Sequence, residues 1–325
     1  MHPAFSVIFL TTLIGVGQGL FLALYTGQLY SVFNVLPVQD SHSFYGFGSL
    51  LALVFLGGGL LASFFHLGHP ERAWRSAAMW RTSWLSREVI VLPAFMGTTL
   101  LYGIVHYFDL NPVLFSISGA FAVDVSLMIG AINTLLAFSL FICTAMIYAC
   151  IKFLQEWASP LTVINYTLLG TASGFTLAAL FASFAQSELV SFYASWAIII
   201  TLAGFVTRIA SLIRNAQIKY KSTLATAIGI RHSEIQQKSR GFMASSYNTR
   251  EYFHGMSIVF MKNIKWLFLV LVFAVPVALL AAGLYQPAIA VFLLAFFVQY
   301  VGLLAERWFF FAQANHPQNL YYQTI

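Results

Sequence analysis

The stretch that decides the fold reads AFSVIFLTTLIGVGQGLFLALYTGQLYSVF and covers residues 4–33. It contains no Asp, Glu, Lys or Arg. About 20 apolar residues already suffice for a helix to cross the hydrocarbon core of a bilayer. The preceding Met1-His2-Pro3 carries no Lys or Arg, and no small-residue cleavage site follows the run. We therefore expect a retained membrane helix and not a signal peptide.

The composition of the whole chain points the same way. Of its 325 residues, 60% are hydrophobic and 17% aromatic, but only 8% are charged. A soluble domain carries about 25% charged residues. The mean hydropathy is +0.82. Because 26 charged side chains cannot cover the surface of a soluble protein of this size, the chain is predicted to be a polytopic membrane protein.

Apolar runs of membrane-spanning length recur eight times along the chain. We expect an all-α fold with spans near residues 4–33, 44–66, 88–107, 127–151, 161–183, 190–213, 265–284 and 288–310. The stretch 108–126 could form a ninth, interfacial segment, and no β-strands are expected. The segment 214–264 is a long polar loop, too short to be a domain of its own. The chain is thus predicted to form a single membrane domain over residues 1–325.

The charges are distributed unevenly between the two ends of these spans. All 16 Lys and Arg residues fall on one side of the eight-span arrangement, and the opposite loops carry only Asp40, Asp109, Asp124 and Glu188. The positive-inside rule then predicts that both termini lie in the cytoplasm, with the chain in the cell inner membrane. The basic loop 214–264 is suited to docking onto anionic lipid or an acidic protein, and not to binding nucleic acid. The residues expected to dock a partner are Arg75, Arg81, Arg231, Arg240 and Arg250.

Small residues and cysteines are interpreted as packing groups. Two GxxxG motifs, at 15–19 and 170–174, predict close helix contacts. Cys143 and Cys150 are expected to be buried core residues, because no CxxC pair or four-cysteine cluster is present to bind zinc or an iron–sulfur cluster. No metal ligands or nucleophilic catalytic residues are therefore assigned.

The densest group of chemically capable side chains lies between the second and third spans. His66 ends one span and Glu88 begins the next, so a short hairpin brings them to similar depth. A histidine that titrates near neutrality and a carboxylate at the membrane boundary could relay the protons that accompany quinone reduction or oxidation. His69, Arg72 and Trp74 would shape the quinone pocket. The ordinary alternative is that these residues are interfacial anchors.

Three further possibilities follow from single residue types. A b-type haem would need facing histidines, but none of the eight lies mid-span; His42 and His106 fall at the outer face. Asp124 could serve an ion or proton if buried, although an outer-surface role is more ordinary. A small-molecule transporter is the rival from another class, but its polar groups would be expected at the midplane and not at one face.

Several motifs resemble one family of membrane proteins. They are MHPA at 1–4, HLG at 66–68, LSRE at 85–88, CTAMIYA at 143–149, NTREYFH at 248–254, AERWFFF at 305–311 and HPQNLYY at 316–322. Together they resemble the dimethyl sulfoxide reductase anchor subunit family, from the first residue almost to the last. The resemblance implies an eight-helix anchor without haem or iron–sulfur clusters. Its partners would be a ferredoxin-like iron–sulfur subunit and a molybdopterin catalytic subunit, and its cofactor a quinone.

Within that family, the resemblance assigns the quinol-site histidine to His66 and the functionally important glutamate to Glu88. The inward orientation of the charges is similar to the sulfite dehydrogenase branch, whose catalytic subunits face the cytoplasm and whose anchor passes electrons from sulfite to quinone. The alternative is a dimethyl sulfoxide reductase-type complex that oxidises menaquinol.

Overall fold

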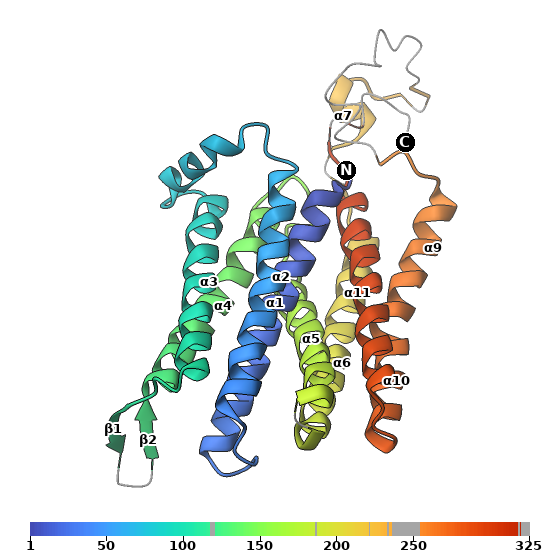
Figure 1. The fold of residues 1–325 in the computed structure, drawn as a ribbon. Coiled ribbons are helices and arrows are strands. Elements are labelled where there is room, and N and C mark those ends of the chain that lie inside the picture. Colours follow the sequence, from blue (N-terminus) through green and yellow to red (C-terminus); the bar gives the residue numbers. More distant parts are fainter. Residues whose placement is uncertain are drawn as a thin grey trace.

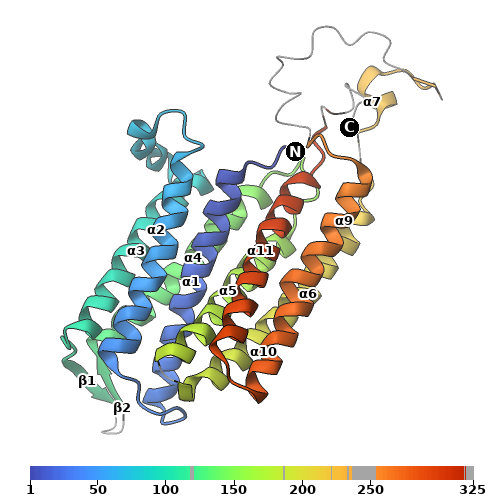
Figure 2. The same cartoon turned by 45° about the vertical axis from the view of Figure 1, so that its right-hand side comes forward.

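In the residues that the computed structural model describes, eight helices or continuous runs of helices of membrane-spanning length run side by side (Figures 1 and 2). The structure describes residues 1–117, 121–185, 187–220, 222–232, 234–235, 254–317 and 319. In chain order, with η marking short 3-10 or π helices, the elements are α1 (Phe5–Val32), η1 (Ser41–Gly46), α2 (Phe47–Phe64), η2 (Pro70–Met79), α3 (Trp84–Tyr107), β1 (Val113–Ile117), β2 (Phe121–Asp124), α4 (Val125–Ala149), α5 (Pro160–Ala185), η3 (Ser187–Leu189), α6 (Val190–Ala216), α7 (Leu224–Ile228), α9 (Ile258–Leu269), η4 (Val270–Ala274), α10 (Val275–Tyr285) and α11 (Ile289–Ala312).

The eight predicted spans are confirmed. Each matches one helix, or one run of helices, that is long and apolar enough to cross a membrane within the described residues. The seventh span differs most, because its helix begins at Ile258 and not near residue 265. The side chain of Ser257 accepts a hydrogen bond from the Phe260 amide at 3.2 Å and caps this helix one turn or more before its apolar run.

Helices α1 and α5 form the centre of the bundle. Their most apolar windows are 72% and 61% buried, whereas those of the other six spans are 28–39% buried. The two GxxxG motifs, which predicted close helix contacts, pack against each other here. A Cβ atom on Gly19 would lie only 2.9 Å from the Thr171 Cα and 3.0 Å from the Gly174 Cα. These glycines therefore permit backbone-to-backbone contact between α1 and α5.

The segment between α3 and α4 corrects the expectation that the chain has no strands. Instead of an interfacial helix, β1 and β2 pair antiparallel, with Val113 opposite Asp124 and Phe115 opposite Val123. The β-branched and aromatic residues of VLFSI and FAVD favour extended backbone. The side-chain carbonyl oxygen of Asn111 accepts from the Ser126 amide at 2.9 Å and closes the base of the hairpin.

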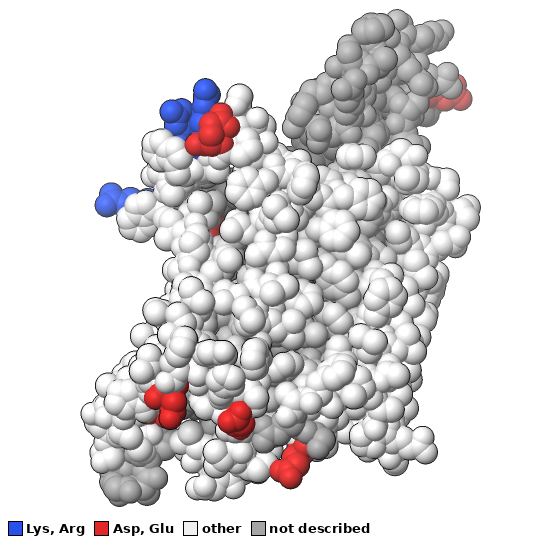
Figure 3. Space-filling view, viewed as in Figure 1, with Lys and Arg blue, Asp and Glu red and all other residues white. Residues whose placement is uncertain are grey.

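The ends of the bundle differ in charge. Figure 3 shows Lys and Arg gathered near η2 at one end, with acidic side chains beside them, whereas the opposite end of this face shows Asp and Glu without Lys or Arg. The N-terminus lies at the same end as η2 in Figures 1 and 2.

The two cysteines differ in burial. Cys143 is buried as expected, but Cys150 is exposed. The prediction for Cys150 is wrong because α4 ends at Ala149 and this residue follows it as the C-cap.

Candidate functional site

The hairpin between α2 and α3 presents four of the predicted quinone-site residues on the surface. His66, His69, Arg72 and Trp74 are all exposed. The His69 Nδ1 lies 3.1 Å from a Glu71 carboxylate oxygen, and the Arg72 Nε lies 3.6 Å from the same oxygen. Partial burial lowers the pKa of His66 from its ordinary value, so its ring favours the neutral form.

The hairpin is held to the start of α3 by Arg87. Its guanidinium donates hydrogen bonds to the Trp80 carbonyl at 2.9 Å and the Arg81 carbonyl at 2.8 Å. The same group stacks over the Trp84 ring, 4.2 Å from its centroid. Because Arg87 directly precedes Glu88 in α3, these contacts connect the hairpin to the part of the helix that carries this carboxylate.

Glu88, the fifth predicted residue, lies inside the bundle. It is buried in α3 and accepts a hydrogen bond from the Thr144 hydroxyl of α4. It borders an internal cavity whose wall also includes Thr11, Thr12 and Gln18 of α1, Tyr166 and Ser173 of α5, and Arg307 of α11. The structure thus places Glu88 on a polar cavity that the other four predicted residues do not line.

The size of this cavity limits what it can hold. The space between its walls is about 450 Å³, but the centre of a water molecule can reach only about 20 Å³ of it. About 10–15 Å³ is enough for one water. The cavity therefore accommodates water and not a quinone ring.

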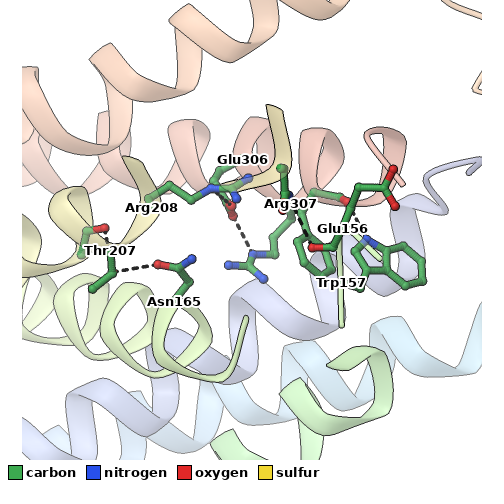
Figure 4. A network of polar contacts seen from close by, with 10 residues as sticks. Glu156, Trp157, Asn165, Thr207, Arg208, Glu306 and Arg307 are labelled. Atoms are coloured by element: carbon green, nitrogen blue, oxygen red, sulfur yellow. Dashed lines mark hydrogen bonds and ion pairs between the residues drawn. The ribbon is translucent and has the colours of Figure 1, made fainter. Parts of the chain in front are cut away.

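A buried ion cluster lies beside the cavity. The Arg208 Nε of α6 is 2.8 Å from one carboxylate oxygen of Glu306, and the Arg307 Nε is 2.7 Å from the other. All three side chains are at most 4% exposed. Figure 4 shows Arg208 and Arg307 on either side of Glu306. Removing either partner of such a buried pair leaves an uncompensated charge, so the cluster ties α6 to α11.

Aromatic rings cover both guanidinium groups. The Arg307 Cζ lies 3.8 Å from the centroid of the Tyr166 ring, and the Arg208 Cζ lies 5.3 Å from that of Phe268. Stacking of this kind is favourable for a desolvated guanidinium.

The sequence pattern did not reveal this cluster. Arg208 and Arg307 were interpreted as inner-face cations, and Glu306 was assigned no role. The signal was available, because all three fall within predicted spans, where ionisable residues are functional suspects.

A second polar network joins the loop after α4 to the end of α11, near the cluster (Figure 4). Glu156 accepts from the Tyr220 hydroxyl at 2.5 Å and the Asn315 amide at 3.2 Å. The Trp157 indole N–H donates to the Phe310 carbonyl at 2.8 Å. Burial raises the pKa of Tyr220, and the adjacent Glu156 carboxylate raises it further. These bonds hold the end of α11 in place and so position Arg307.

At the other end of the bundle, the remaining candidates have structural partners. Asp124 caps α4 by accepting from the Leu127 amide at 2.8 Å. His106 is buried, with its Nδ1 2.6 Å from the Ser41 hydroxyl. Within the described ranges, no three His, Cys, Asp or Glu side chains are grouped to hold a metal ion.

Comparison with known proteins identifies the family. A model of the DMSO reductase anchor subunit (DmsC) family matches residues 1–322. The chain belongs to this family. It is also similar to the C subunit of sulfite dehydrogenase from Allochromatium vinosum, with 55% identity over 325 residues that cover the whole of both chains. The protein is thus a multi-pass membrane anchor subunit, and an anchor subunit is part of a multi-subunit oxidoreductase complex.

The residues predicted to dock partners of this anchor subunit are only partly described. Arg75, Arg81 and Arg231 are exposed. Arg240 and Arg250 lie outside the described residues. The guanidinium groups of Arg75 and Arg81 lie 5.6 Å and 5.3 Å from the ring centroids of the neighbouring Trp74 and Trp80.

Proposed function

We propose that this anchor subunit passes electrons from an iron–sulfur subunit to a quinone in a sulfite-oxidising complex. The full-length similarity to a sulfite dehydrogenase subunit supports the choice of substrate. The single observation that carries the quinone assignment is the buried carboxylate of Glu88 on a polar cavity within the membrane. Ionisable groups at such depth are rare and usually serve protons, ions or substrates.

The quinone itself requires a larger and less polar site. A groove between α1 and α2 is lined by Ser6, Phe9, Leu13, Gly58, Leu61, Ala62 and Phe65. The centre of a water molecule can reach about 300 Å³ of this groove. That volume, and the apolar walls, suit a prenylated ring that arrives from the lipid. Phe65 lines the groove and directly precedes His66 in the chain, which supports placing the histidine beside a bound quinone.

The chemistry divides between the two residues. A quinone takes up two electrons and two protons on reduction. The neutral ring of His66 can donate a hydrogen bond to a quinone oxygen, and its second nitrogen can accept a proton from water. Glu88 can hold a proton within the bundle and exchange it with water of the polar cavity. His69, Arg72 and Trp74 would orient the ring at the membrane surface.

The cationic end of the bundle is proposed to be the cytoplasmic one, in the inner membrane. The positive-inside rule supports this orientation for both termini. Arg75 on η2 and Arg81 in the turn after it, together with Arg231, Arg240 and Arg250 in the 214–264 loop, would dock the ferredoxin-like subunit, which in turn carries the molybdopterin subunit. Positive charge at this surface favours an acidic partner. Residues 1–325 would form one membrane domain, of which the 214–264 loop is the docking part.

Replacing His66 tests the assignment. In the purified complex, His66→Leu should lower the rate of sulfite-dependent quinone reduction at least about tenfold, which corresponds to about 1.4 kcal/mol of lost transition-state stabilisation. Assembly and sulfite oxidation with an artificial electron acceptor should be unchanged, because the hairpin residue is exposed. His42→Leu is the matched control, since His42 is also an exposed histidine but lies outside the hairpin and the docking residues. An unaltered quinone rate in the His66→Leu complex would exclude the proposed role.

A further inference from the structure

The buried ion cluster of Arg208, Glu306 and Arg307 carries a net positive charge. Arg208 and Arg307 contribute two cations, whereas Glu306 contributes one anion. An uncompensated charge in a water-poor interior is strongly unfavourable, so a counter-charge nearby is expected.

The geometry of Arg307 shows where that counter-charge can be. Its Nε contacts Glu306, and its side chain also interacts with that of Tyr166. Its Nη1 is buried and has no hydrogen-bond acceptor among the described protein groups. Arg307 lines the same cavity as Glu88, to which the cluster's other two members do not contribute. Among the cavity-lining residues in the described part of the chain, Arg307 is the one cation and Glu88 the one anion. Including Glu88 makes two cations and two anions, and the buried set becomes neutral.

We propose that Glu88 and Arg307 form a water-bridged ion pair across this cavity, in which Arg307 is a positioning residue that holds the carboxylate ionised between proton transfers. A water in this cavity can donate to Glu88 and accept from the Arg307 Nη1. The hydroxyls of Thr11 and Thr12 line the same space and already donate to the Ile8 carbonyl, so their oxygens remain as acceptors. A water with several such partners is a stable part of a structure.

The other groups that face Glu88 do not supply a competing charge. From α4, the thiol of Cys143 and the hydroxyl of Tyr148 act on it electrostatically, and from α5 the hydroxyl of Tyr166 does so. These groups are neutral at physiological pH. Helix α1 contributes Thr11, Thr12 and Gln18, which do not titrate. Arg87 lies on the same helix as Glu88 and is directed to the hairpin carbonyls.

The ion pair can be tested without quinone turnover. Infrared difference spectra of the purified complex, with the Glu88→Gln spectrum subtracted, report how the protonated carboxyl band of Glu88 varies with pH. In Arg307→Gln the band should persist to a pH about one unit higher or more than in the unmodified protein, because the partner cation is lost. Arg307→Lys, which keeps the charge, should restore most of the profile. Arg208→Gln should shift it less, since Arg208 does not border the cavity.

The charge balance makes these variants tolerable. In Arg307→Gln, Glu306 keeps its ion pair with Arg208 at 2.8 Å. If Arg307→Gln nevertheless fails to accumulate in membranes, the double variant Glu88→Gln/Arg307→Gln removes one charge of each sign and should accumulate to a higher level. Equal loss of both variants, or an infrared profile that Arg307→Gln leaves unchanged, would overturn the ion pair.

This inference deepens the proposed function, and the two can fail separately. A shifted infrared profile with unaltered quinone turnover in Glu88→Gln would support the ion pair but refute its role in quinone chemistry. An unchanged profile with lost turnover in Glu88→Gln would leave the quinone role and refute the pair.

Discussion

Glu306 should be the most sensitive single residue for the stability of the bundle. It is the one anion that both Arg208 and Arg307 contact, at 2.8 Å and 2.7 Å, and it is 1% exposed. Glu306→Gln keeps the size of the side chain but removes the anion that both guanidinium groups contact directly. Removing one partner of a single buried pair costs about 3–5 kcal/mol. Because two pairs are broken together, we expect a loss at or above the upper end of this range.

The matched variants separate charge from packing. Arg307→Gln breaks one ion pair but leaves the Arg208–Glu306 pair neutral, so its loss should be clearly smaller than that of Glu306→Gln. The fourfold variant Glu88→Gln/Arg208→Met/Glu306→Leu/Arg307→Met removes both cations and both anions and should recover much of the loss, because apolar groups of similar size can replace buried ion networks at little cost. The neighbouring rings of Tyr166, Phe268 and Phe309 provide apolar surface for the new side chains.

The assay is unfolding of the purified chain in mixed micelles of mild and denaturing detergent, followed by fluorescence of its 7 tryptophans. A loss of about 4 kcal/mol lowers the folding equilibrium constant about a thousandfold. If the free energy of unfolding of Glu306→Gln lay within about 1 kcal/mol of that of the unmodified chain, the cluster would not be a buried ion network of the kind described.

Three further predictions concern packing, the buried carboxylate and pH. Gly19→Ala should destabilise the chain by about 1–3 kcal/mol through overpacking against α5. Gly97→Ala is the control, because its added methyl meets open space and should cost nothing comparable. Equal unfolding curves for the two variants would contradict the close contact between α1 and α5. Thr144→Val removes the hydrogen bond to Glu88 and should cost about 1–3 kcal/mol in the same unfolding assay, while Thr134→Val, whose hydroxyl bonds only to the Gly130 carbonyl of its own helix, should cost less. Partial burial lowers the pKa of His66 in the folded chain. The stability of the folded chain that depends on a neutral His66 is therefore fully present above pH about 6.5 and is lost as the pH falls through the lower folded pKa. An NMR titration of labelled histidines should give a midpoint for His66 below 6.5, and a midpoint at or above that value would contradict the lowered pKa.

Apolar run length was sufficient to predict the helices but not their partners. The eight spans could be predicted because a helix of about 20 apolar residues matches the thickness of the hydrocarbon core of a bilayer. The hairpin of β1 and β2 was missed because VLFSI and FAVD are short and lie between polar residues, where neither length nor alternation is decisive. The exposure of Cys150 depends on where α4 ends, a boundary that the sequence leaves uncertain by a few residues.

The candidate site was predictable only in part. Glu88 was selected correctly as an ionisable residue near a membrane boundary, but its neighbours come from α1, α4, α5 and α11. Glu88 and Arg307 line the same cavity although they are far apart in the chain. No local sequence pattern predicts that they are neighbours. Arg307 and Glu306 were visible as charges within a span, yet the positive-inside rule counts any Arg near a helix end as an orientation signal. Depth and pairing distinguish the two roles, and both require the tertiary structure.

The central place of α1 has a consequence for how the protein is made. Among the described spans α1 is the most buried, yet it is synthesised before α5 and α11, which cover it, so its glycines, threonines and Gln18 first lie without these neighbours. Its glycine face is covered only when α5 is inserted, and the Thr12–Tyr300 contact forms only after α11 has been synthesised. The packing of α1 therefore stays incomplete until α11 is in the bilayer, and truncation before α11 would leave polar groups of α1 facing acyl chains.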